Sequence, residues 1–256
     1  MADVSGAASQ SHGHQVRKIR DDRPWHWLAL GWQDMTRAPQ VSFAFGICLA
    51  LASWALAYGL WFAEFGYLVL PMAAGFFLIA PLIAVGLYDT SRRLQQGRPV
   101  DLGLALMAWR RPLQVASFGM VLLLLHFAWV RVALLWFALY FSDGTPPLDA
   151  LPFFMLEAAN LPFLVIGGLI GSGFALVAFS ISAIALPMLL DREVDVFTAM
   201  ITSVRTVQAN PRAMALWAGL IVMLTAIGLV TFFVGLVVMF PLVAHATWHA
   251  YRELVA

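Results

Sequence analysis

The sequence has few charged residues for its length. Asp, Glu, Lys and Arg make up 11% of its 256 residues, whereas 62% are hydrophobic. A soluble globular domain carries about 25% charged residues. Because so few charges cannot cover a surface exposed to water, we expect lipid to surround most of the chain. The formal net charge of +1 gives no indication of nucleic acid as a partner.

Cysteine is nearly absent, and the N-terminus lacks an apolar segment. Cys48 is the single cysteine, which excludes a disulfide framework and a cysteine-rich metal site. The first residues contain no apolar stretch of about 7–15 residues, such as a signal peptide needs. We therefore predict a disordered cytoplasmic tail over residues 1–24 and a single transmembrane domain over residues 25–256.

Long apolar stretches fill the rest of the chain, and a helix of about 20 such residues crosses a bilayer. The stretch from Ala213 to Trp248 contains no Asp, Glu, Lys or Arg. As one helix it would be roughly 54 Å long, against a hydrocarbon core of about 30 Å. We therefore place two crossings there, with a tight reversal near Gly228–Gly235. The sequence thus predicts an all-α fold, a polytopic membrane helix bundle with six transmembrane helices at about 41–62, 67–88, 112–140, 161–190, 213–230 and 233–250.

Basic residues fall on one side of this six-helix arrangement, and Lys and Arg mark cytoplasmic loops. Arginines lie in the N-terminal segment, in the loops after the second and fourth spans, and at Arg252. The opposite loops, around Glu64 and from Ser142 to Asn160, contain neither Lys nor Arg. We therefore expect both termini in the cytoplasm and the protein in the bacterial inner membrane.

Two cytoplasmic loops resemble each other. The segment RPVDLGLALMAWRRP follows the second span, and REVDVFTAMITSVRTVQANP follows the fourth. Each contains a short helical pattern between an Arg-x-Val-Asp start and a proline. Asp101 and Asp195 are placed to cap these helices through their carboxylates. We predict two short amphipathic helices lying at the cytoplasmic interface, in a parallel repeat of span, short helix and span.

His126 and Arg131 are ionisable residues inside the third span, where charge is costly. One interpretation is a proton or anion path through the bundle. The simpler one is a histidine bonded to a backbone carbonyl, with Arg131 reaching the outer head groups or pairing with an acidic residue of the outer loops. The candidate acidic partners are Glu157, Asp143 and Glu64.

The C-terminal motif PLVAHATWHAYREL places His245 and His249 on one helix face, where they could share a metal ion or haem. Zinc proteases add a glutamate between such histidines, which is absent here. Because Trp248, Tyr251 and Arg252 surround the pair, we favour the anchored end of a helix at the membrane interface. Packing against the segment GLYDTSRRL is the remaining alternative. We predict no bound cofactor and keep His245 and His249 as weak metal candidates.

The segment GLYDTSRRL is the second concentration of polar residues. Asp89 and Arg93 form an i,i+4 pair in the favourable order. Arginines at this edge also attract anionic lipid head groups. Together with the C-terminal motif they define a predicted cytoplasmic-edge interaction site, which comprises Asp89, Arg92, Arg93, His245, His249, Tyr251 and Arg252.

The motifs GLYDTSRRLQQGRP and PLVAHATWHAYREL together resemble a family of predicted bacterial integral membrane proteins, domain of unknown function 2189, from about Trp27 to the end. The resemblance implies a six-span inner-membrane group without an established activity. Some members carry a label as a cytochrome c oxidase subunit. An oxidase catalytic subunit needs several intramembrane histidines on different helices, whereas this chain offers His126 and the terminal pair.

The sequence does not indicate a reaction, and three functions remain open. The first is a non-enzymatic accessory protein that binds membrane lipids or a membrane complex such as a respiratory oxidase. The second is a small transporter or permease with a path near His126. The third is a haem- or copper-binding respiratory accessory subunit.

Overall fold

The computed structural model describes residues 16–65, 68–108, 113–141 and 157–255. This part of the chain is helical, apart from one antiparallel bridge between Val16 and Val255. The helices are α1 (Arg23–Arg37), α2 (Pro39–Phe62), α3 (Val69–Ile83), α4 (Val85–Gln95), α5 (Leu102–Met107), α6 (Leu113–Tyr140), η3 (Ala158–Asn160), α8 (Leu161–Ser182), α9 (Ala185–Asp191), α10 (Val196–Ala209), α11 (Pro211–Val230) and α12 (Leu236–Leu254).

Four stretches of helix are long and apolar enough to cross a membrane, and they confirm four of the six predicted spans. They are Pro39–Phe62, Leu113–Tyr140, Ala158–Asp191 and Pro211–Val230. The predicted spans at 67–88 and 233–250 correspond to α3 with α4 and to α12. These two stay predictions, because α3 is short and the second half of α12 is rich in polar side chains.

Helix starts follow local sequence signals. A proline occupies the first turn of α1, α2, α8 and α11, where its missing N–H costs nothing. Asp101 and Asp195 accept the backbone N–H groups of Leu104 and Thr198, both at 2.9 Å, which confirms the predicted caps of α5 and α10. The bonds from the hydroxyl and N–H of Thr198 also lower the pKa of Asp195.

The two predicted repeat units also share a break that the sequence did not reveal. The second and fourth spans are each interrupted, between α3 and α4 at Ala84 and between α8 and α9 near Ala183. Pro187 accounts for the second break, because a proline ring collides with the carbonyl four residues before it. Each unit then continues through a capped short helix to a further long helix.

The predicted reversal near Gly228–Gly235 is confirmed, since α11 ends at Val230 and α12 begins at Leu236. Phe232 and Phe233 adopt positive φ of 52° and 67° there. Bulky residues rarely enter this left-handed region, and glycine or asparagine normally marks it. A turn made by two phenylalanines therefore leaves no polar signal in the sequence.

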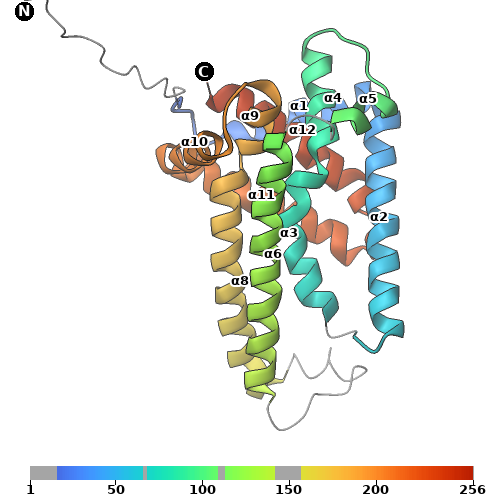
Figure 1. Cartoon of the computed structure of the whole chain (residues 1–256), viewed down its shortest axis with the longest axis vertical. Coiled ribbons are helices and arrows are strands. Elements are labelled where there is room, and N and C mark those ends of the chain that lie inside the picture. The colour runs from blue at the N-terminus through green and yellow to red at the C-terminus, as the bar shows by residue number, and fades with distance from the viewer. Residues whose placement is uncertain (1–15, 66–67, 109–112, 142–156, 256) are drawn as a thin grey trace, which may run out of the picture.

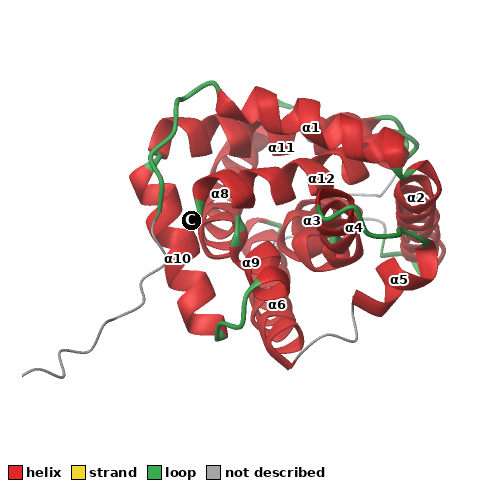
Figure 2. Cartoon of the chain, turned by 90° about the horizontal axis from the view of Figure 1, so that it is seen from above, coloured by secondary structure: helices red, strands yellow, loops and turns green. Residues whose placement is uncertain are grey.

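The long helices form two sub-bundles. In the first, α3, α6 and α8 pack on one another, and in the second α12 packs on α2 and α11. The two groups meet mainly through a cap, which we define as α1, α4, α5, α9 and α10 at the end of the molecule that carries the C-terminus (Figure 1). Seen from above, α1 and α12 lie side by side across this end, and α12 also contacts α4 and α9 (Figure 2).

The flanks of the long helices expose apolar side chains that water would not tolerate in such numbers. Leu51 on α2, Leu124 on α6 and Leu169 on α8 are 64%, 61% and 68% exposed. The buried residues instead concentrate where the cap helices meet α12, so most residues of α12 from Ala244 onward are buried. Such a distribution is typical of a bundle whose solvent is the hydrocarbon core of a membrane.

The predicted disordered tail is wrong for residues 16–24, while residues 1–15 lie outside the described residues. Arg17 donates its backbone N–H to the carbonyl of Leu254 at 2.9 Å. The side chain of Asn210 binds the carbonyl of Arg17 and accepts the N–H of Ile19, both at 3.0 Å. The segment is ordered because it pairs with the end of α12, a contact between residues far apart in sequence.

Candidate functional site

The C-terminal half of α12 enters the centre of the cap, and His245 is fully buried there. One ring nitrogen lies 2.9 Å from the hydroxyl of Ser42 on α2, and the other lies 2.7 Å from that of Ser91 on α4. His245 therefore links three helices through two neutral side chains, and both ring nitrogens are occupied.

His249 lies one turn further along α12 and makes a second set of contacts. Its Nε2 is 2.8 Å from Asp34 of α1, and its Nδ1 is 3.2 Å from the side chain of Gln95 on α4. Trp248 donates its indole N–H to the same glutamine at 3.0 Å. Asp34 and His249 are both buried, so this is an ion pair or charge-assisted hydrogen bond inside the protein.

The segment GLYDTSRRL forms α4 and faces α9. Asp89 is buried and lies 2.7 Å from both Arg92 and Arg93, which confirms the predicted i,i+4 pair. Arg92 also donates to the backbone carbonyl of Leu190 near the C-terminal end of α9, where the helix dipole favours a cation. This arginine therefore joins the two helices that follow the breaks.

The last turn of α12 completes the network at the surface. Tyr251 donates its hydroxyl to Asp191 at 2.8 Å, and Arg252 donates to the same carboxylate at 2.9 Å. Arg192 donates to the hydroxyl oxygen of Tyr251 at 3.0 Å. Towards α1, the carboxylate of Glu253 accepts a hydrogen bond from the side chain of Arg23 at 2.6 Å.

The structure thus brings together all seven residues of the predicted edge site. The interpretation of the two histidines and Trp248 as an interfacial anchor is wrong, because all three are buried in the protein and bonded to α1, α2 or α4. Packing against GLYDTSRRL, the remaining alternative, is confirmed. Across the described ranges no group of three or more His, Cys, Asp or Glu side chains could hold a metal ion.

His126 is buried on α6, and its Nδ1 is 3.2 Å from the carbonyl of Gly75 on α3, the simpler of the two predicted arrangements. A Cβ on Gly75 would lie 2.7 Å from that nitrogen, so only glycine at this position leaves room for the ring of His126 in its present place. It also borders a space of about 190 Å³ whose lining is otherwise apolar apart from Ser53. Arg131 is exposed and forms no ion pair within the described residues, and Asp143 lies outside them.

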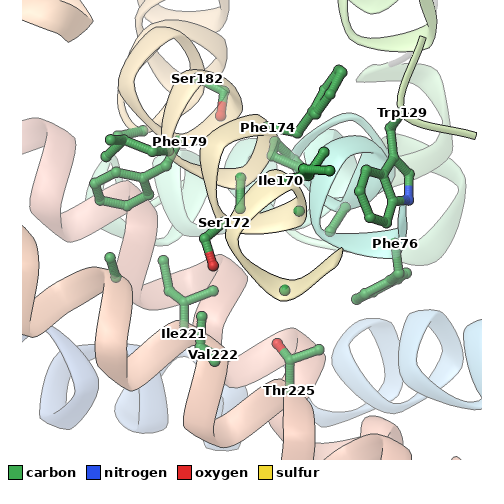
Figure 3. A pocket seen from close by; sticks show the side chains of 18 of the residues that line it. Phe76, Trp129, Ile170, Ser172, Phe174, Phe179, Ser182, Ile221, Val222 and Thr225 are labelled. Carbon is green, nitrogen blue, oxygen red and sulfur yellow. The ribbon is translucent and has the colours of Figure 1, made fainter. Parts of the chain in front are cut away.

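A larger cavity of about 760 Å³ lies between the two sub-bundles. Figure 3 shows Ser172 and Phe174 of α8, Trp129 of α6 and Ile221 and Val222 of α11 around it. The described lining residues are aromatic, aliphatic or small, and none of them is charged. Its volume is within the range of about 300–1,000 Å³ that is typical of small-molecule sites.

The glycines of α8 shape one wall of this cavity. Gly171 packs against Trp129 and Gly167 against Trp136, since a Cβ on either would lie 3.0 or 3.1 Å from the indole ring. Gly168 lines the cavity, and a Cβ there would meet nothing within 4 Å. Two glycines of α8 thus allow tryptophan rings of α6 to approach the helix closely.

The sequence did not indicate the cavity or α1. A signal for α1 is present: Pro24 sits in its first turn, and Trp27, Gly31, Asp34 and Met35 form its buried stripe at helical spacing. The cavity has no comparable signal, because its walls come from α3, α6, α8, α11 and α12.

Residues 69–191 match a family described as predicted integral membrane protein, DUF2189. The match runs from α3 to α9, so it covers one whole sub-bundle and the motif GLYDTSRRLQQGRP. The resemblance is confirmed over a shorter range than the predicted one from Trp27 to the end, and the C-terminal motif lies outside it. No curated protein and no solved structure matches the chain.

Proposed function

We propose, from the match of residues 69–191 to predicted integral membrane proteins, that this protein is a non-enzymatic lipid-binding protein of the bacterial inner membrane. In this proposal six helices cross the bilayer, both termini are cytoplasmic, and an acyl chain of a membrane lipid occupies the cavity between the sub-bundles. The observation that carries the proposal is the uncharged cavity of about 760 Å³ among helices whose outer faces are apolar.

The cap supports this orientation. Its helices expose large apolar side chains although they lie outside the long spans: Trp25 and Trp32 on α1, Leu106 on α5, Phe197 and Ile201 on α10. The buried face of α10 is instead made of small and hydroxyl residues. Amphipathic helices with this pattern lie at the boundary between head groups and acyl chains. The arginines of the same end support a cytoplasmic location for it by the positive-inside rule.

Reporter fusions test the topology. Alkaline phosphatase, which is active only outside the cytoplasm, should be inactive when fused after Ala256 and active when fused after Val234 in the turn between α11 and α12. The measurement is enzyme activity per amount of fusion protein. A fluorescent protein fused after Ala256 is the control and should fluoresce. An active phosphatase after Ala256 would show that the six-span arrangement is wrong.

Access from the bilayer supports lipid as the occupant of the cavity. The helix α8 packs on α3, α6 and α10 but not extensively on α11, so the cavity opens on the flank between α8 and α11. Leu176 of α8 and Val222 of α11 line the cavity and are 63% and 51% exposed. Its apolar wall offers water molecules few hydrogen-bond partners. An acyl chain entering from the side fills it with favourable contacts and loses no hydrogen bonds.

Filling the cavity should reduce lipid binding. We expect Gly168→Leu to lower the amount of lipid that co-purifies in mild detergent at least about fivefold, because the leucine would occupy the space of the chain and its displacement costs about 1–3 kcal/mol. Native mass spectrometry measures bound lipid per protein. The matched control is Gly173→Leu on the same helix, where a Cβ also meets nothing but which does not line the cavity. Equal lipid content in both variants and the parent would refute the proposal.

A further inference from the structure

One residue that lines the cavity carries a buried hydrogen-bond donor that the described part of the protein does not use. Trp217 is fully buried and lines the cavity from α11, and its indole N–H has no partner among the described residues. Trp27 packs edge-on against it with ring centroids 5.6 Å apart, but donates its own N–H to Glu253 at 2.6 Å. Because buried donors are nearly always paired, the free N–H of Trp217 points to an acceptor supplied by a ligand.

Two buried hydroxyls that line the cavity are already used. Ser182 donates to the carbonyl of Ala178 at 2.6 Å, and Thr247 donates to that of Val243 at 2.8 Å. Both bonds stay within the residue's own helix, one turn back. Trp217 differs because an indole N–H cannot reach its own backbone in this way, so its donor remains available to a bound molecule.

The position of Trp217 indicates which part of a lipid it would meet. Ala84 and Ala183, at the two helix breaks beneath the cap, line the same end of the cavity, whereas Trp136 and Phe163 line the far end. In the proposed topology the cap lies at the head-group boundary. The cavity wall carries no charge among its described residues, so a phosphate would stay outside. The ester carbonyls of a glycerolipid lie between its chains and its phosphate and are uncharged acceptors.

We infer that Trp217 donates its indole N–H to an ester carbonyl of a glycerolipid whose acyl chain lies in the cavity. This inference rests on the proposed function and adds the group of the lipid that is recognised. The lipid is held by apolar contact along its chain and oriented by one hydrogen bond at the cap end.

A comparison of two lipids tests the inference on the full chain. The probes are a diester phosphatidylcholine and its diether analogue with identical chains, offered in equal amounts and measured by native mass spectrometry. One hydrogen bond corresponds to about a three- to tenfold preference for the diester. No preference in the wild-type protein, with both lipids bound, would overturn the inference and leave the proposed function standing. Binding of neither lipid would overturn both.

Two variants test whether Trp217 causes the preference for the diester lipid. Trp217→Phe keeps an aromatic ring and removes the N–H, so it should bind the two lipids equally while retaining the diether. Trp54→Phe is the control, because Trp54 does not line the cavity and its indole N–H already donates to the carbonyl of Phe232 at 2.8 Å, so its loss should leave the preference intact. A preference for the diester that persists in Trp217→Phe would mean that another residue donates to the ester carbonyl, and would overturn the inference. Displacement of the diester by an equal amount of a long-chain quinone would overturn the choice of glycerolipid.

Discussion

An alanine at position 46 should destabilise the protein by about 2–3 kcal/mol, because it would push α2 away from α12. The Cβ of such an alanine would lie 2.8 Å from the Cα of Val237 and closer still to its carbonyl oxygen. These are backbone atoms, so no side-chain rotation relieves the contact, and overpacking of this kind costs about 1–3 kcal/mol. Small residues at helix crossings serve this close approach in membranes. The measurement is the midpoint of unfolding in a titration with sodium dodecyl sulfate, followed by circular dichroism.

Gly59 provides the matched control on the same helix. A Cβ there would meet nothing within 4 Å. Gly59→Ala should therefore leave the free energy of unfolding unchanged or raise it by up to about 1 kcal/mol, the gain in helix propensity, and the midpoint should stay or rise accordingly. Opposite signs for the two substitutions would identify the α2–α12 crossing as the cause. Equal midpoints for Gly46→Ala and the parent would mean that the two helices are not in contact at Gly46.

The second large effect is expected at Asp34. Replacing it with alanine leaves the buried His249 without its partner across α1 and α12, and breaking a buried pair in this way costs about 3–5 kcal/mol. Asp34→Asn keeps a side chain of the same shape that can hydrogen-bond to the ring, so it should lose less. The same detergent titration measures both.

Asp22→Ala is the control for Asp34. Asp22 pairs with Arg20 at 2.7 Å, but both side chains are largely exposed, so its removal should change stability by less than about 1 kcal/mol. If Asp34→Ala were as mild as Asp22→Ala, α1 would not depend on His249 for its place on α12. A large loss in Asp34→Ala would instead show that the C-terminal motif holds the cap together.

The polar residues show which contacts can be predicted from a single sequence and which cannot. The spacing of Asp89 and Arg93 was sufficient to predict their pairing, because residues four apart on a helix are neighbours whatever surrounds them. The same holds for Asp101 and Asp195, which cap the helices that follow them. The partners of His245 are different, because Ser42 and Ser91 come from distant helices and neither residue is distinctive in its own segment.

The long apolar helices and the uneven distribution of basic residues among the connecting segments were determined by the sequence alone, since hydropathy and charge act residue by residue against the membrane. The tertiary structure decided which helices and side chains are in contact. In the tertiary structure the two histidines lie at the centre of the cap, although their sequence context is typical of an interfacial anchor. Residues 16–24 are ordered against α12, and a cavity lies between the two sub-bundles. The physical reason is that burial and pairing depend on side chains from helices far apart in the chain, whose meeting is fixed by packing and is not encoded in any one segment.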